Sequence, residues 1–143
     1  MKLSKIWVVL AGALAISACQ TTTGAVSRAS VPSDLNAAQV KLYELPLESY
    51  YGSVRVGRLL ANGCDSYEFD TRLDSEINER RNEQGRGSFA ALSRRKAVQT
   101  AMAQAEADIG SQYGVNPRTD NLCAAASAEV QKQSVNSALL IAK

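Results

Sequence analysis

The sequence predicts an all-α protein, a small four-helix bundle closed by one disulfide. Apolar residues recur at helical spacing through most of the chain beyond residue 45, and no segment has a convincing strand pattern. Glycine, proline and capping residues divide this pattern into segments with short connections, as expected of antiparallel neighbours in a bundle. Two cysteines, Cys64 and Cys123, fall near the ends of predicted helices.

The first eighteen residues have the layout of a secretory signal peptide. Lys2 and Lys5 precede an uncharged apolar run over residues 6–16, and two small residues follow before Cys19. The run is shorter than the about 20 apolar residues needed to cross a membrane as a helix. Residues 1–18 are therefore predicted to be a signal that is removed on export.

The four residues Ile16-Ser17-Ala18-Cys19 resemble the lipobox of bacterial lipoproteins, which is an aliphatic residue and two small ones before a cysteine. The resemblance implies that the Cys19 thiol receives a diacylglyceryl group, that cleavage occurs just before Cys19, and that the new amine is acylated, for example with palmitate. Several acyl chains make anchoring stable. An ordinary signal peptide with an incidental cysteine is the alternative.

Gln20 bears on which membrane holds the protein. An aspartate at this position would resemble an inner-membrane retention signal, so Gln20 favours the outer membrane with the domain facing the periplasm. The inner membrane and the cell surface stay open as alternatives. Residues 19–36 are predicted to be the lipidated cysteine and a flexible tether rich in Thr, Ser and Ala. Such a tether holds a domain roughly 20–25 Å from its anchor.

The helical domain is predicted over residues 37–143. A short extra helix is expected over 36–45. The first main helix begins near Pro46, a residue suited to the first helical position, and ends at Asn62-Gly63. The second begins with Asp65 as its cap and Glu68 three residues later.

Residues 85–87, Gly-Arg-Gly, break the second helix, and Ser88 caps a third that runs to about Tyr113. The apolar stripe of this third helix is Ala91, Val98, Met102, Ala105 and Ile109, with Phe89 at its start. Gly114 ends the third helix. Asp120 is predicted to cap a fourth helix that extends to Leu140 and Ile141.

Three cysteines must be accounted for. With Cys19 assigned to lipid, Cys64 and Cys123 remain as a pair in an exported domain, and disulfides persist in an oxidising compartment. A bridge between them closes a loop of about 60 residues and stabilises the domain by about 4 kcal/mol in the chain-entropy model. Two free buried thiols or a metal pair are the alternatives, although without histidine or a CxxC a zinc site lacks ligands.

Charge and motifs narrow the class of function. Removing Lys2 and Lys5 with the signal reduces the 16 basic side chains to 14, equal to the 14 acidic ones, so nucleic acid is not an expected partner. The sequence has no histidine, and no nucleotide-binding, hydrolase or metalloprotease motif is present. We therefore expect no cofactor and a non-enzymatic function.

Carboxylates are the remaining candidates for catalysis. Those on or beside the second predicted helix are Asp65, Glu68, Asp70, Asp74, Glu76, Glu79 and Glu83. A hydrolase needs two carboxylates at a set separation in a cleft. Helical spacing instead spreads most of these over a solvated face, so a carboxylate-dependent hydrolase is the weakest of the functional alternatives.

Six basic residues surround the glycine turn and form the candidate anion-binding site. They are Arg80, Arg81, Arg86, Arg94, Arg95 and Lys96. In the structural interpretation, Arg94 and Arg95 pair with Glu76, Glu79 and Glu83 across a helical hairpin. In the functional interpretation, a basic tip meets lipid head groups, an anionic envelope polysaccharide or an acidic protein.

From Gly57 to Ile141 the chain resembles an uncharacterised family of small exported alphaproteobacterial proteins. The residues that carry the resemblance are Gly57-Arg58-Leu59-Leu60, Cys64, Arg94-Arg95-Lys96-Ala97, Tyr113-Gly114-Val115, Leu122-Cys123-Ala124, Ala128-Glu129-Val130 and Leu139-Leu140. The resemblance implies no activity and transfers no functional residue. The lipobox departs from the plain secretion signals of that family.

These inferences predict a membrane-anchored envelope lipoprotein that acts as a non-enzymatic interaction or structural module. Its partners are then the membrane, through covalent lipid, and an envelope protein or an anionic envelope polymer. An inhibitor or accessory subunit of an envelope enzyme or secretion apparatus is the alternative.

Overall fold

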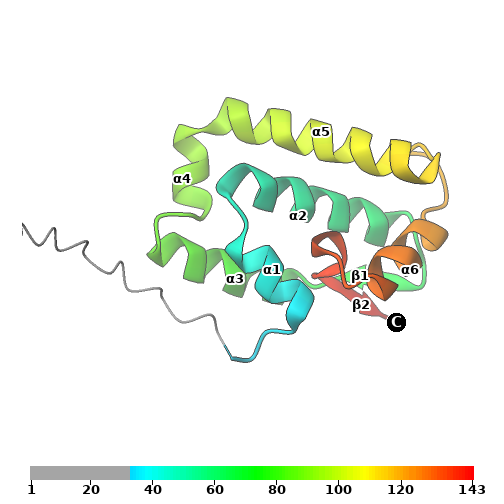
Figure 1. Cartoon of the computed structure of the whole chain (residues 1–143), viewed down its shortest axis with the longest axis horizontal. Coiled ribbons are helices and arrows are strands. Elements are labelled where there is room, and N and C mark those ends of the chain that lie inside the picture. The colour runs from blue at the N-terminus through cyan, green and yellow to red at the C-terminus, as the bar shows by residue number, and fades with distance from the viewer. Residues whose placement is uncertain (1–32) are drawn as a thin grey trace, which may run out of the picture.

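Two long helices, α2 (Leu47–Asn62) and α5 (Arg95–Tyr113), run parallel and pack along their length (Figure 1). Gly52 on α2 permits this approach, because a Cβ there would lie 3.1 Å from the Ala105 Cβ and 3.3 Å from the Ala101 carbonyl oxygen. The computed structural model describes residues 33–143. The predicted signal peptide, Cys19 and most of the predicted tether lie outside the described residues.

Six α-helices, a 3₁₀ helix and two short strands make up the described chain. Besides α2 and α5, the elements are α1 (Ala37–Glu44), β1 (Tyr67–Phe69), α3 (Thr71–Glu83), α4 (Ser88–Ser93), α6 (Cys123–Gln131), η1 (Val135–Ser137) and β2 (Leu140–Ala142). The protein is thus mostly helical, as predicted. A four-helix bundle is wrong in detail, because there are more helices and because the first and third long helices are direct neighbours.

The beginning of the domain follows local sequence signals. Asn36 and Gln39 form a reciprocal capping box, in which each side chain accepts a hydrogen bond from the other residue's backbone amide, at 2.9 and 3.0 Å. This confirms the short helix expected over 36–45. The next helix starts directly after Pro46 and ends at Gly63, also as predicted.

The second predicted helix begins later than expected, because residues 67–69 form a strand. β1 pairs antiparallel with β2, with Tyr67 opposite Ala142 and Phe69 opposite Leu140. Tyr67 and Phe69 are half-buried while Glu68 between them is exposed, which is the alternation of a strand with one covered face. The prediction of no strand was therefore wrong, and Asp70, whose side chain accepts a hydrogen bond from the Leu73 amide at 2.9 Å, is the true cap of α3.

The third predicted helix is interrupted at Arg94, where α4 meets α5 at an angle (Figure 1). Two side chains of α3 hold the start of α4. Asn78 accepts a hydrogen bond from the Ser88 amide at 3.0 Å, and Asn82 accepts one from the Phe89 amide at 3.1 Å. Because α4 is held by α3 while α5 packs on α2, the chain changes direction between them.

The fourth predicted helix is shorter at both ends. Asp120 accepts a hydrogen bond from the Asn116 amide at 2.7 Å and so closes the preceding turn, and α6 starts only at Cys123. α6 ends at Gln131, and Gln133 adopts a left-handed backbone with φ of 48°. The chain beyond it forms η1 and then β2, so Leu140 belongs to a strand.

The Cys64–Cys123 disulfide is present and joins the end of α2 to the start of α6, with the two Cα atoms 4.7 Å apart. The Leu122 amide donates to the Gly63 carbonyl at 2.8 Å beside it. A Cβ on Gly63 would lie 2.6 Å from the Leu122 Cγ, so only glycine fits here without rearrangement. Of the alternatives for this pair, free thiols and a metal site are both excluded.

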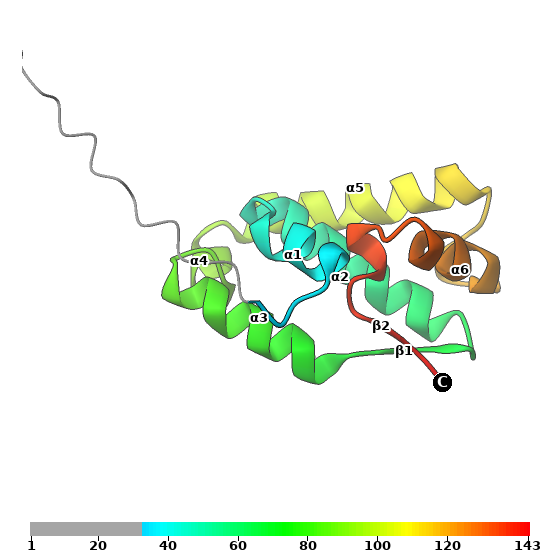
Figure 2. The same cartoon turned by 60° about the horizontal axis from the view of Figure 1, so that its bottom comes forward.

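The core has two parts that share α2. One lies between α1, α2, α3 and the η1 region, and its members include Leu42, Tyr50, Ile77 and Leu139. The other lies between α2, α5 and α6 beside the disulfide, and its members include Leu60, Cys64, Ile109 and Leu122. α4 lies at one end of the molecule and the C-terminus at the other (Figures 1 and 2).

Candidate functional site

Arg81 is a core residue, although it was predicted to belong to the anion-binding cluster. Its side chain is fully buried and donates to the carbonyls of Tyr43 at 2.5 Å, Leu45 at 2.9 Å and Arg86 at 3.2 Å. Its guanidinium carbon lies 4.2 Å from the ring centroid of Tyr50. Burial, followed by the nearby charge of Arg86, lowers the pKa of Arg81 below its ordinary value. Arg81 therefore binds the end of α1 and is not available to a surface ligand.

Arg80 and Arg94 are held by carboxylates of other segments. Arg80 donates twice to Asp34, at 3.2 and 3.3 Å, and these hydrogen bonds lower the pKa of the Asp34 carboxyl. Arg94 forms an ion pair with Glu48 in the first turn of α2. The partner of Arg94 is thus on α2, and the predicted pairing with α3 carboxylates is wrong for this residue, because the bend at Arg94 directs the chain toward α2.

The remaining three basic residues are more available. Arg86 donates to the side-chain oxygen of Gln84 and lies 5.5 Å from the ring centroid of Tyr43, whereas Arg95 and Lys96 are exposed at the start of α5. Within residues 33–143, none of these three forms an ion pair. They are the part of the predicted cluster that can still meet an external anion.

Two large apolar side chains lie between these basic residues and were not singled out as a site from the sequence. Phe89 and Leu92 on α4 are each 75% exposed. We call Phe89 and Leu92, together with the basic residues Arg86, Arg95 and Lys96 that flank them in the sequence, the α4 face. The sequence did contain one indication of this exposed pair, because Leu92 falls outside the apolar stripe of the predicted third helix. Phe89 was assigned to the core because the third helix was predicted to be continuous.

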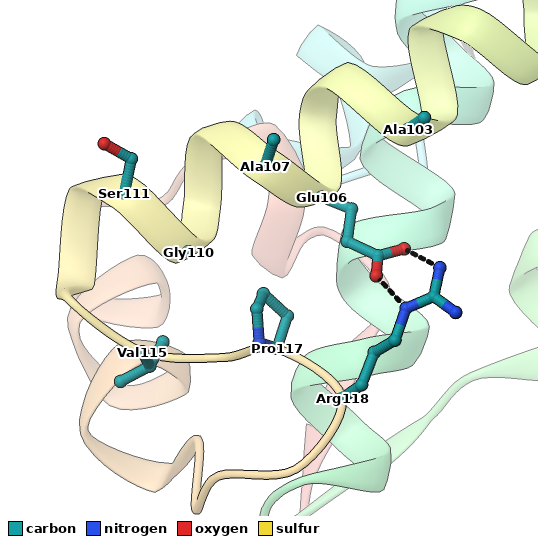
Figure 3. Close-up of a pocket in the computed structure, with 8 residues that line it drawn as sticks. All are labelled: Ala103, Glu106, Ala107, Gly110, Ser111, Val115, Pro117 and Arg118. Atoms are coloured by element: carbon teal, nitrogen blue, oxygen red, sulfur yellow. Dashed lines mark hydrogen bonds and ion pairs between the residues drawn. The ribbon is translucent and has the colours of Figure 1, made fainter.

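A second candidate is an open hollow of about 380 Å³ beside the C-terminal half of α5 (Figure 3). Its lining is Ala103, Glu106, Ala107, Gly110, Ser111, Val115, Pro117 and Arg118. Glu106 accepts hydrogen bonds from Arg118 on one side and from Arg55 on the other, the latter at 3.0 and 3.1 Å. These contacts, Arg118 first, lower the pKa of Glu106 despite its partial burial. An ionised carboxylate shared by two guanidinium groups joins the loop after α5 to α2, and is poorly suited to proton transfer.

Glu129 is the second carboxylate with a dense set of donors, and unlike Glu106 it is buried, with its side chain 3% exposed. Ser134 donates to one carboxylate oxygen at 2.6 Å and Asn136 at 2.9 Å, while Tyr113 donates to the other oxygen. Burial acts to raise the pKa of Glu129, but these hydrogen bonds outweigh it, and the pKa lies below its ordinary value. The arrangement ties α6 to the segment that follows it and to α5.

Three of the seven carboxylates on or beside α3 make separate structural contacts, and the other four, Asp65, Glu68, Glu79 and Glu83, are exposed. Asp70 caps the helix, as described above. Asp74 accepts hydrogen bonds from the Tyr50 hydroxyl at 3.2 Å and from Arg58 at 2.7 Å. Burial, followed by the charge of Asp74, raises the pKa of Tyr50. Glu76 pairs with Arg72 along the helix at 2.7 Å. These contacts favour a stabilising role over a catalytic pair.

In the part of the chain that the structure describes, no group of three or more His, Cys, Asp or Glu side chains is placed to hold a metal ion. None of the helices between residues 33 and 143 is both long enough and apolar enough to span a bilayer.

The chain was compared with protein-family models, curated proteins and solved structures, and none of them matches it.

Proposed function

We propose that the protein is an exported lipoprotein, anchored to a membrane through lipid on Cys19, whose helical domain is a non-enzymatic interaction or structural module of the cell envelope. The observation that carries the proposal is the disulfide between Cys64 and Cys123. It accounts for two of the three cysteines and leaves Cys19, in its lipobox-like context, as the remaining one. A disulfide in a small domain is also typical of proteins that work in an oxidising compartment.

The non-enzymatic part of the proposal rests on how the ionisable groups are used. Glu106, Glu129 and Asp74 each accept hydrogen bonds from donors of the same chain. The contacts of Glu106 and Glu129 hold their pKa values below the ordinary value, which suits structural carboxylates better than a general acid. The outer membrane, with the domain facing the periplasm, is the expected location.

The second candidate function is an inhibitor or accessory subunit of an envelope enzyme or secretion apparatus. It is favoured by the exposed Phe89 and Leu92, since exposed large apolar side chains often mark a protein contact. Photo-crosslinking from position 89 in intact cells tests this candidate, because a stoichiometric adduct with an envelope enzyme or a secretion component supports the subunit and the absence of such an adduct contradicts it.

Cell fractionation tests the anchor. The full chain is expected in the membrane fraction and the Cys19→Ser variant is expected to be released or left unprocessed, because serine cannot form the thioether to lipid. Thr22→Ser, a change of similar size three residues later, is the matched control and should fractionate like the original protein. Equal membrane retention of the Cys19→Ser variant, with a normally cleaved signal, contradicts the proposal.

A further inference from the structure

The α4 face exposes apolar area that the rest of the fold does not cover. Phe89 and Leu92 are three residues apart in one helix, so they lie on the same side of it. Each is 75% exposed, although burying such a side chain is worth about 1.5–3 kcal/mol. Two such side chains on one side of a short helix are available for contact with something outside the described residues.

The charges that flank these apolar side chains in the sequence are of one sign. Between Gln84 and Ala105 the chain has four basic residues and no acidic one. Glu48 pairs with Arg94, which leaves Arg86 in the turn before α4 and Arg95 and Lys96 at the start of α5 without an ion pair among the described residues. Apolar side chains flanked by Lys and Arg are characteristic of segments that lie in the interface of a membrane with anionic lipids.

The course of the chain places this face near the anchor. The ion pair of Asp34 with Arg80 holds the beginning of the described chain against the last turn of α3. The same end of α3 carries α4, through Asn78 and Asn82. The segment that leads back to Cys19 therefore leaves the domain at the end that bears the α4 face. Cys19 lies 15 positions before Asp34, and the tether predicted from the sequence would span roughly 20 Å over that length.

We infer that the α4 face docks on an anionic phospholipid surface, with Phe89 and Leu92 inserted among the head groups and Arg86, Arg95 and Lys96 facing lipid phosphates. The inference rests on the proposed function, since the anchor supplies the high local concentration that a small contact surface requires. A lipid surface fits better than a protein partner or a second copy, because the charge, the apolar pair and the exit of the tether all lie at one end.

A single tryptophan tests the docking. Trp7 is the one tryptophan of the chain and lies in the predicted signal, so Phe89→Trp provides a unique reporter in the processed protein. Ile141→Trp is the matched control, because within residues 33–143 Ile141 is the other exposed large apolar residue, and it lies on β2 at the opposite end. Each variant is purified with its lipid and reconstituted in vesicles of phosphatidylcholine with phosphatidylglycerol, with or without bromine on the acyl chains.

The emission of the Phe89→Trp variant is expected to shift to shorter wavelength and to be quenched by brominated lipid, and that of Ile141→Trp to show neither effect. Adding Arg95→Gln and Lys96→Gln should lower the docking equilibrium constant about twenty-five-fold, at roughly fivefold for each charge. Arg72→Gln, with a side chain 78% exposed at the other end of α3, should leave docking unchanged.

Flotation of the vesicles separates failure of docking from failure of the anchor. If the protein floats with the vesicles but Trp emission at position 89 is unquenched, the docking surface is overturned and the anchor stands. If the protein does not float, the proposed function is contradicted; the variant is then added to preformed vesicles, where quenching supports the docking surface and its absence overturns it. A spectral shift that depends on protein concentration, without quenching, assigns the face to a second copy and also overturns the inference.

Discussion

Replacing Arg81 with Met is expected to destabilise the fold by about 3–5 kcal/mol, although Arg81 stands in a conspicuously basic segment. The Arg81 guanidinium donates three hydrogen bonds to the carbonyls of Tyr43, Leu45 and Arg86. Hydrogen bonds with one charged partner contribute about 1.5–3 kcal/mol each, and a desolvated cation over an aromatic ring about 2 kcal/mol. The variant retains a long apolar side chain but leaves those carbonyls without this partner.

The gross contribution of Arg81 is reduced by the cost of burying its charge. That cost is several kcal/mol for an ion, and Nη2 of Arg81 has no hydrogen-bond partner among the described residues. The net value of about 3–5 kcal/mol is what remains. Arg81→Lys keeps the charge but lacks the planar guanidinium group and stacks less well on Tyr50. Its free energy of unfolding should therefore lie between that of the original protein and that of Arg81→Met.

Urea unfolding followed by circular dichroism in the helical band measures this effect. For an m value of about 1.5–2 kcal/mol per M, the midpoint of Arg81→Met should fall by roughly 1.5–3 M. Arg80→Met is the control, because Arg80 is the preceding residue of α3 and its ion pair with Asp34 is exposed to solvent and contributes little. Equal shifts for the two variants would refute the assignment of Arg81 to the core.

Removing the disulfide by Cys64→Ala with Cys123→Ala should lower the free energy of unfolding by about 4 kcal/mol, since the bridge spans 59 residues. A urea midpoint equal to that of the original protein, measured without reductant, would contradict this. Glu129→Gln should destabilise the protein by about 1.5–3 kcal/mol at pH 7, because glutamine lacks the negative charge to which Ser134 and Asn136 donate hydrogen bonds. The folded-state pKa of Glu129 lies below the unfolded-state value of about 4.3, so its contribution is complete above that pH and is lost as the pH falls through the folded-state pKa. The stabilities of the two proteins should therefore converge in acid, and a difference that stays constant down to pH 3 argues against this role.

Much of the helical framework was predictable because its signals are local. Asn36 and Gln39 sit three residues apart, and Pro46 and Gly63 bracket α2. The strand over 67–69 had no such signal, because its partner β2 lies more than 70 residues away and the pairing is decided by tertiary packing. The sequence offers two possible N-caps for α3, Asp65 and Asp70, and the choice of Asp70 depends on the pairing of β1 with β2 in the folded chain.

The candidate site was predictable in composition but not in arrangement. Arg80 and Arg81 are equivalent in the sequence, yet one is paired at the surface and the other is buried, because only Arg81 faces the carbonyls at the end of α1. Phe89 is exposed because the chain bends at Arg94, so that α4 does not continue the axis and the apolar face of α5. Both outcomes depend on contacts between segments far apart in the chain.

The mass of the N-terminal peptide of the protein extracted from membranes tests the central proposal most directly. The account predicts a chain that begins at Cys19 and carries the added mass of a diacylglyceryl group, with a further acyl chain on the amine. A chain that retains Met1, or a peptide in which Cys19 has an unmodified thiol, would contradict it.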